Sequence, residues 1–324
     1  MKAIRLYDYG GPETLVLENV SKPEPKHDQV LVKIHAASVN HIDWGKASGM
    51  LKHIFPLQFP WVPGEDFAGI VESVGENVKS FKPGDAVFGH SSGGGAYAEF
   101  VAVGTETIAK MPSNLTFVEA AAVPVAAETA WQGLFIHARL AEGQTILIHG
   151  GAGAVGAYAI QFAHQAGATV IVTASGSDTQ FLESLGADRI IDYKTEKFES
   201  GTNNADVVFD LVGGEIQQRS YGVLKEGGQL IATNHPVSVE EAAKHRISAM
   251  LMHMKPSREG LNHIAELLEA GKIRPDIADI LPLEKAPEAW KSLSLNLSVR
   301  SPTPNKDAHK KNGHGKIVLQ VVVE

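Results

Sequence analysis

The first 120 residues alternate apolar and polar positions in short runs separated by glycine and proline. Residues 30–39, 68–74 and 96–103 show the two-residue periodicity of half-buried strands. Residues 82–85 (KPGD) and 91–95 (SSGGG) between them have the composition of tight turns. This part of the chain is therefore expected to form a small antiparallel barrel or folded sheet.

From about residue 124 the pattern changes to apolar runs that alternate with helical segments. The apolar runs are residues 145–148, 169–172, 205–209 and 229–232. In residues 154–166 the apolar side chains recur every three or four positions, and Gly167 follows where a helix-ending residue is expected. Such alternation predicts a parallel sheet covered by helices on both faces.

The remaining segments add elements to both halves. Residues 189–191, 247–253 and 316–323 predict short strands, and residues 257–270 and 284–293 predict helices. Residues 301–315 are polar and contain two prolines, so they predict a surface loop.

Composition and charge exclude several classes of protein. Hydrophobic residues make up 44% and charged residues 20% of the 324 residues, an ordinary globular mixture. A net charge of −8 argues against a partner rich in phosphates, such as a nucleic acid. The absence of cysteine excludes disulfides, thiolate catalysis and every zinc site that needs a cysteine ligand. No apolar run is long enough to cross a membrane, so a cytoplasmic location is expected.

A glycine-rich sequence at residues 150–156 (GGAGAVG) follows the apolar run 145–148 and precedes the predicted helix. Gly151 is expected to make the tight turn, Gly153 to let the backbone approach a pyrophosphate, and Gly156 to let the helix pack close to its strand. Backbone N–H groups at the helix start would hold the phosphates. Within a series of strand–helix units, this sequence predicts a dinucleotide site.

The residues after the second apolar run bear on the choice of cofactor. NAD-specific sites normally carry an acidic residue there, which accepts hydrogen bonds from the ribose 2′-hydroxyl. Here the sequence is TASGS at residues 173–177, and the hydroxyls of Ser175 and Ser177 can donate to a 2′-phosphate. Asp178 is assigned to the start of the next helix. NADPH is therefore the expected cofactor.

Several motifs occur in the order typical of one superfamily. They are residues 37–43 (ASVNHID), 63–69 (PGEDFAG), 82–87 (KPGDAV) and 128–131 (ETAW), the glycine sequence, residues 185–188 (LGAD), 191–193 (IDY) and 315–319 (GKIVL). Over essentially its whole length the chain resembles the medium-chain dehydrogenase/reductase superfamily. Within it, the chain resembles the zinc-free NADPH:quinone oxidoreductase (zeta-crystallin-like) and enone reductase branch.

This resemblance implies an α/β fold of two domains. Residues 1–122 and 266–324 would form a GroES-like β-rich catalytic domain, and residues 123–265 a Rossmann NADP-binding domain with a doubly wound parallel sheet. The resemblance also implies that the cofactor lies between the domains and that the protein is a homodimer.

The resemblance assigns the site residues as well. Asn40 is expected to face the nicotinamide ribose, and Thr129 and Asn234 the nicotinamide end. The expected cofactor-binding residues are Gly151, Ala152, Gly153, Ala154, Val155, Gly156, Ser175, Ser177, Tyr193 and Lys316.

Four of these residues have a purely structural alternative. Asn40 could cap the helix that begins there, and Thr129 could bond to the backbone of its own helix. Tyr193 could be a half-buried loop aromatic, and Lys316 a solvated strand flank.

The predicted reaction follows from the missing metal ligands. Zinc-dependent relatives use cysteine and histidine, but this chain has no cysteine, and Glu65 and Asp66 stand where the family's His-Glu pair is found. Hydride transfer without a metal suits an acceptor that is already electrophilic, such as a quinone or an α,β-unsaturated carbonyl compound. The alternative is an NADP(H)-binding sensor or structural protein without turnover. The substrate stays open, because Trp44, Gly45 and Leu51 replace the tyrosines that quinone reductases often carry.

Overall fold

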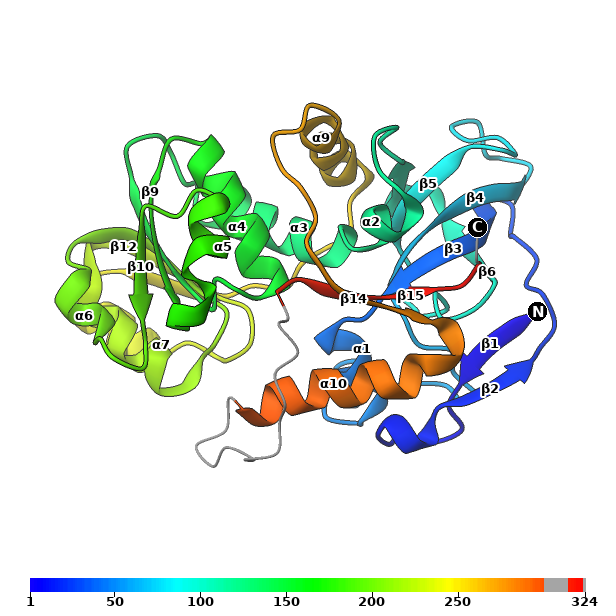
Figure 1. Cartoon of the computed structure of the whole chain (residues 1–324), viewed down its shortest axis with the longest axis horizontal. Helices are drawn as coiled ribbons and strands as arrows, with labels where there is room; N and C mark the ends of the chain where they lie inside the picture. Colours follow the sequence, from blue (N-terminus) through cyan, green and yellow to red (C-terminus); the bar gives the residue numbers. More distant parts are fainter. Residues whose placement is uncertain (300–313, 323–324) are drawn as a thin grey trace. The chain divides into compact units, whose positions relative to one another are not determined.

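The computed structural model describes residues 1–299 and 314–322. The chain divides into two compact units (Figure 1). Unit 1 comprises Met1–Val125, Pro256–Glu269 and Pro275–Glu324, and unit 2 comprises Ala126–Lys255 and Ala270–Arg274. Unit 1 is rich in antiparallel strands and unit 2 contains a parallel sheet, which confirms the predicted α/β class.

The second junction between the units differs from the expected one at residue 266. Helix α9 (Arg258–Glu269) belongs entirely to unit 1, where it packs against strand β7 (Ile108–Lys110). The side chain of Asn114 donates a hydrogen bond to the carbonyl of Leu268 at 2.9 Å, which holds the end of this helix.

Unit 1 is built on a seven-stranded sheet of order β14-β15-β3-β4-β5-β7, with β6 also paired to β3, and on a separate β1-β2 sheet. Its other strands are β1 (Lys2–Arg5), β2 (Val16–Asn19), β3 (Gln29–Ser38), β4 (Asp66–Val74), β5 (Ala86–His90), β6 (Phe100–Gly104), β14 (Ile277–Pro282) and β15 (Lys316–Gln320). Its other helices are α1 (His41–Ala47), α2 (Phe117–Ala121) and α10 (Ala286–Val299), with short 3-10 turns at Pro12–Thr14, Thr105–Thr107 and Leu283–Lys285.

Strand β3 is the centre of this sheet. It pairs antiparallel with β4 along its length, with β6 through its first half and with β15 through its last three residues. Because Ser38 pairs with Val318, the end of β3 lies beside the start of β15. This register brings residues that are far apart in the sequence to one point.

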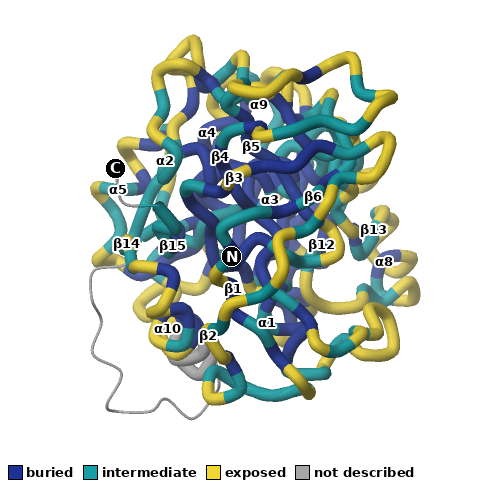
Figure 2. Tube along the Cα trace, turned by 90° about the vertical axis from the view of Figure 1, so that its right-hand side faces the viewer, coloured by how far each residue is buried: buried dark blue, intermediate teal, exposed yellow. Residues whose placement is uncertain are grey.

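Large apolar side chains from several elements of unit 1 form its core. Trp290 of α10, Phe67 of β4 and Ile34 of β3 are fully buried in one cluster. Figure 2 shows the same distribution along the backbone, with β3 and β4 buried and the connecting loops exposed. Burial of each such side chain contributes about 1.5–3 kcal/mol, so this core stabilises the sheet that carries the polar groups described below.

Unit 2 contains a six-stranded sheet in which every pair is parallel. Its strands are β8 (Thr145–His149), β9 (Thr169–Ala174), β10 (Arg189–Asp192), β11 (Ala205–Asp210), β12 (Leu224–Ala232) and β13 (Ser248–Leu251). Its helices are α3 (Pro124–Trp131), which begins in unit 1, a π-helix (Gln132–His137), α4 (Ala154–Gln165), α5 (Thr179–Ser184), α6 (Phe198–Gly201), α7 (Gly214–Ser220) and α8 (Val239–Lys244), with 3-10 turns at Gly176–Asp178 and Tyr221–Val223.

The strand order β10-β9-β8-β11-β12-β13 determines where unit 2 can bind a ligand. The chain proceeds from β8 outward through β9 and β10, and then returns to the other side of β8 with β11. At such a reversal the loops after the neighbouring strands diverge and leave a crevice at their carboxyl ends. A ligand of unit 2 is therefore expected at the carboxyl ends of β8, β9 and β11.

Most of the strands and helices predicted from the sequence lie within a few residues of observed elements, and Gly167 and Gly271 adopt φ angles of 74° and 65° two residues after the ends of α4 and α9. The predicted strand 96–103 is wrong in its first half, because Ile4 donates its N–H to the carbonyl of Tyr97 at 2.8 Å and this segment bends toward β1. The predicted loop 301–315 falls mostly outside the described residues. Across residues 1–299 and 314–322, no helix has the length and apolar character needed to span a bilayer.

Candidate active site

The glycine sequence forms the connection between β8 and α4. Gly150 makes the turn with a φ of 79°, whereas we expected Gly151 in that role. Gly151 is needed for a different reason, since a Cβ there would lie 2.0 Å from Cγ1 of Val172 on β9. The loop can therefore pass directly over β9 only with glycine at this position.

The start of α4 has the geometry that phosphate binding requires. A Cβ on Gly156 would lie 2.5 Å from the carbonyl oxygen of Gly150, so the helix packs directly on the loop that precedes it. Gly153 is the N-cap residue, and the four residues Ala152, Gly153, Ala154 and Val155 are partly exposed. Backbone N–H groups in a first helical turn have no partner within the helix and lie at its positive end.

A lysine that the sequence analysis missed lies beside the predicted 2′-phosphate residues. Nζ of Lys194 donates to Oγ of Ser175 at 3.0 Å, and Oγ of Ser177 lies 3.1 Å from the same atom. Asp178 is the N-cap residue of α5, in agreement with its assignment to a helix start. The available signal was the position of Lys194 directly after Tyr193, where β10 ends beside the end of β9.

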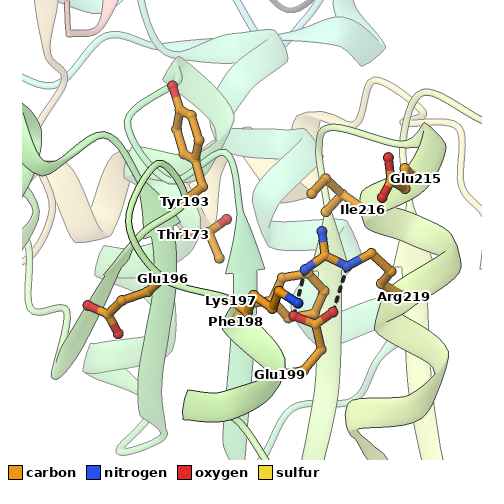
Figure 3. Close-up of a pocket in the computed structure, with 9 residues that line it drawn as sticks. All are labelled: Thr173, Tyr193, Glu196, Lys197, Phe198, Glu199, Glu215, Ile216 and Arg219. Atoms are coloured by element: carbon orange, nitrogen blue, oxygen red, sulfur yellow. Dashed lines mark hydrogen bonds and ion pairs between the residues drawn. The ribbon is translucent and has the colours of Figure 1, made fainter. Parts of the chain in front are cut away.

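A cavity of 260 Å³ opens next to these residues (Figure 3). Its lining consists of Thr173, Tyr193, Glu196, Lys197, Phe198, Glu199, Glu215, Ile216 and Arg219. Tyr193 is 58% exposed, so it is not a half-buried aromatic. Arg219 donates to both carboxylate oxygens of Glu199 at 2.5 and 2.7 Å, and these hydrogen bonds lower the pKa of Glu199.

His149 is buried at the end of β8, beneath the loop. Its Nε2 lies 2.9 Å from Oγ of Ser220, which itself donates to the carbonyl of Ile216, so Nε2 carries the proton and donates to Ser220. Nδ1 then accepts from the hydroxyl of Thr173 at 2.9 Å. Burial lowers the pKa of His149 to about 4, and the ring is neutral near pH 7.

In unit 1, Asn40 and Lys316 meet at a buried carboxylate, that of Asp66. Nδ2 of Asn40 donates to Oδ2 of Asp66 at 3.0 Å, and Nζ of Lys316 donates to Oδ1 of Asn40 and to Oδ2 of Asp66, the latter at 3.2 Å. Lys316 is 5% exposed and Asn40 6%, so Lys316 is not a solvated strand flank.

Asp66 is charged in spite of its environment. Burial by itself raises the pKa of this carboxyl, but the Lys316 ammonium, together with His90 and Asn40, outweighs burial and holds the pKa below its usual value. The hydroxyl of Ser38 and the backbone N–H of Val125 each donate to Asp66 at 2.9 Å. Asp66 is therefore the anion around which Asn40 and Lys316 are arranged.

Asn40 is also the N-cap residue of α1, where it forms a capping box with Asp43. The carboxylate of Asp43 accepts the backbone N–H of Asn40 at 2.9 Å, while the Asn40 amide is bonded to Lys316 and Asp66. Burial, and next the charge of Glu65, raise the pKa of Asp43 well above its usual range.

Glu65, which by the family resemblance stands where zinc-dependent enzymes carry a metal ligand, is part of a buried ion pair. Glu65 is bonded to the buried ammonium of Lys46, and Oε2 of Glu65 lies 3.4 Å from Nε2 of His90. Lys46 also donates to the carbonyl of Ser92 at 3.1 Å. Within the part of the chain that the structure describes, no three His, Asp or Glu side chains gather as a metal site.

Thr129 and Asn234 belong to unit 2, whereas Asn40 belongs to unit 1. Thr129 is half-buried in α3, and the exposed Asn234 donates from Nδ2 to the carbonyl of Leu211 at 2.7 Å. The structure thus brings Asn40 together with Lys316, and Ser175 with Ser177. The convergence of Asn40, Thr129 and Asn234 on one nicotinamide ring stays a prediction.

Comparisons with known proteins identify the relatives of this chain. The family models "Alcohol dehydrogenase GroES-like domain" and "Zinc-binding dehydrogenase" match residues 26–113 and 185–296. The chain is 41% identical over 289 residues to 2-methylene-furan-3-one reductase of Solanum lycopersicum, covering 86% of this chain and 71% of the relative. It is 36% identical over 310 residues to a chloroplastic NADPH-dependent alkenal/one oxidoreductase of Arabidopsis thaliana, covering 91% and 77%. The structure of quinone oxidoreductase from Coxiella burnetii matches with a TM-score of 0.88 at 33% identity and covers 99% of both chains.

A GroES-like unit combined with a doubly wound unit that carries the glycine loop defines a medium-chain dehydrogenase/reductase. The chain belongs to the zinc-free quinone oxidoreductase and enone reductase branch of this superfamily. It is therefore an oxidoreductase, and the predicted family is confirmed.

Proposed function

We propose that the protein transfers hydride from NADPH to an acceptor whose carbonyl is conjugated, either an α,β-unsaturated carbonyl compound or a quinone. The observation that carries this proposal is the glycine loop before α4 together with the Lys194–Ser175 pair beside it. The printed names of the relatives, an enone reductase, an NADPH-dependent alkenal/one oxidoreductase and a quinone oxidoreductase, support the same reaction.

The preference for NADPH rests on charge at the end of β9. The Lys194 ammonium and the hydroxyls of Ser175 and Ser177 offer donors to a 2′-phosphate. Arg219 is already bonded to Glu199, whereas Nζ of Lys194 lies 3.0 Å from Oγ of Ser175, so we assign the phosphate contact to Lys194. Asp192, two residues before Lys194, accepts the backbone N–H of that lysine at 3.0 Å.

The glycine loop suits the pyrophosphate of the same cofactor. At Gly151 and Gly156 a Cβ would collide with Val172 and with the loop backbone, and Ala152 to Val155 leave the helix start accessible. When bound, NADPH supplies the hydride, and the protein has to orient the acceptor and stabilise charge that develops on its oxygen. Asn40, Thr129 and Asn234 are our candidates for that orientation.

An assay of NADPH oxidation with different acceptors tests the proposal. The acceptors are quinones, linear enones, simple ketones and a blank without acceptor. We expect turnover with enones, quinones or both, and none with simple ketones. Turnover confined to simple ketones would contradict the proposal, and tight NADPH binding without any turnover would favour a sensor.

Two further expectations concern the protein in its cell. The cytoplasmic location stays a prediction, which fractionation of the producing cell would check. The homodimer is a prediction as well, and sedimentation velocity of the purified protein is the measurement, with a single monomeric species as the contrary result.

A further inference from the structure

The contacts of Asn40 determine how its amide is oriented. An ammonium can only donate and a carboxylate can only accept. Because Lys316 is bonded to one end of the amide and Asp66 to the other, Oδ1 must face Lys316 and Nδ2 must face Asp66. One N–H of the amide is used by Asp66, and the second is the donor that Asn40 can offer to a ligand.

Asp66 and Lys316 are themselves held from several elements of unit 1. Asp66 accepts from Ser38 on β3 and from the backbone of Val125 at the start of α3, and Lys316 bonds to it from β15. All of these groups except Val125 are buried. The amide of Asn40 therefore cannot rotate without breaking two bonds to buried charged groups, which is costly in a site that water does not reach.

We propose that Lys316 and Asp66 are positioning residues, which act on turnover by fixing the amide of Asn40 rather than by contacting the cofactor. This inference rests on the proposed function, in which Asn40 orients the nicotinamide end of the site. It replaces our expectation that Lys316 binds the cofactor directly. Its consequence is that Lys316 affects turnover only while Asn40 is present.

The consequence can be measured with four proteins: wild type, Lys316→Met, Asn40→Ala and the double variant. We expect Lys316→Met to lower kcat by about 10-fold or more while the KM for NADPH changes by less than about 3-fold. In the Asn40→Ala background the same change should lower kcat by less than about 2-fold, because residues that act as one unit are not additive.

Two further variants distinguish an effect on turnover from a change in folding. Lys33→Met removes an exposed lysine from the same strand that carries Ser38, and it should leave kcat unchanged. Ser38→Ala removes one hydrogen bond from Asp66 without removing a charge. It should lower kcat by about 2- to 5-fold, with no further loss in the Asn40→Ala background.

Crystal structures of wild type and of Lys316→Met give a readout that does not depend on turnover. Ser38→Ala takes the place of Lys316→Met if the methionine variant does not fold. We expect the Asn40 amide to leave its wild-type orientation in the variant. An unchanged amide, equal losses of kcat in both Asn40 backgrounds, or a loss confined to the KM for NADPH would overturn the inference. Absence of turnover in wild type would refute the proposed function instead, and the crystal structures would still decide whether Lys316 holds Asn40.

Discussion

Replacing Lys194 with methionine tests how the protein distinguishes NADPH from NADH. The change removes the ammonium that lies 3.0 Å from Oγ of Ser175, where we place the 2′-phosphate. Opposite unit charges about 4 Å apart interact by about 1 kcal/mol in water and about 4 kcal/mol at an effective dielectric constant of 20. Since Lys194 is exposed, the lower part of this range applies, and we expect a loss of about 1–2 kcal/mol, or a 5- to 30-fold higher Kd for NADPH.

Binding titrations of both cofactors, at low and at high ionic strength, measure this effect. The Kd for NADH should stay within about 2-fold of wild type, and the advantage of NADPH in the wild-type protein should shrink as salt is added. Lys225→Met is the matched control, because Lys225 pairs with Asp206 near the start of β11, at the opposite end of the strands. Equal weakening of NADPH and NADH, or an unchanged Kd for NADPH, would refute the placement of the phosphate.

Four other predictions concern the two units. Asn40→Ala should retain folding and NADPH affinity while kcat falls by about 10- to 100-fold. Full kcat of this variant in steady-state assays would show that Asn40 is not part of the active site. Because burial lowers the pKa of His149 from 6.5 to about 4, the stability that the neutral ring contributes is complete above pH 6.5 and is lost as the pH falls toward 4. Urea titrations should show this as a decrease of up to about 3 kcal/mol in the free energy of unfolding. A His149→Gln variant with the same pH dependence would contradict the prediction. Lys46→Met leaves the buried Glu65 without its ion-pair partner and should lower the free energy of unfolding by about 3–5 kcal/mol. The double variant Lys46→Met with Glu65→Leu should restore most of this loss. A Lys46→Met variant as stable as wild type in denaturant titrations would refute the prediction. Activity should survive chelators, and elemental analysis that finds one zinc per chain, with loss of activity on chelation, would contradict metal independence.

Much of unit 2 could be predicted from the sequence, because its elements follow from local pattern. Apolar runs of four or five residues identified strands β8, β9, β11 and β12, and Gly167 identified the end of α4. The loop after β8 shows the limit of such reasoning. The sequence contains two adjacent glycines, and only the path of the chain over Val172 shows that Gly150 makes the turn and Gly151 the close approach.

The polar groups of unit 1 could not be predicted, because their partners are distant in the sequence. Lys316 lies 276 positions from Asn40, and a Gly-Lys pair before a strand looks the same whether the lysine is solvated or buried. The register of β15 against β3 determines that Lys316 is buried, because it places the lysine next to Asp66. The bend at Tyr97 has the same cause, since its partner Ile4 is near the other end of the unit's first segment.

The most direct test of the central claim follows the hydride itself. Purified protein is incubated with NADPH that carries deuterium at both hydrogen positions of C4 and with a linear enone, and the product is examined by mass spectrometry and NMR. Reduction of the conjugated double bond by hydride transfer predicts one deuterium on the β-carbon of the saturated ketone for each NADPH oxidised. NADPH oxidation that leaves no deuterium on carbon, or a label found on the carbonyl carbon of an allylic alcohol, would contradict the account.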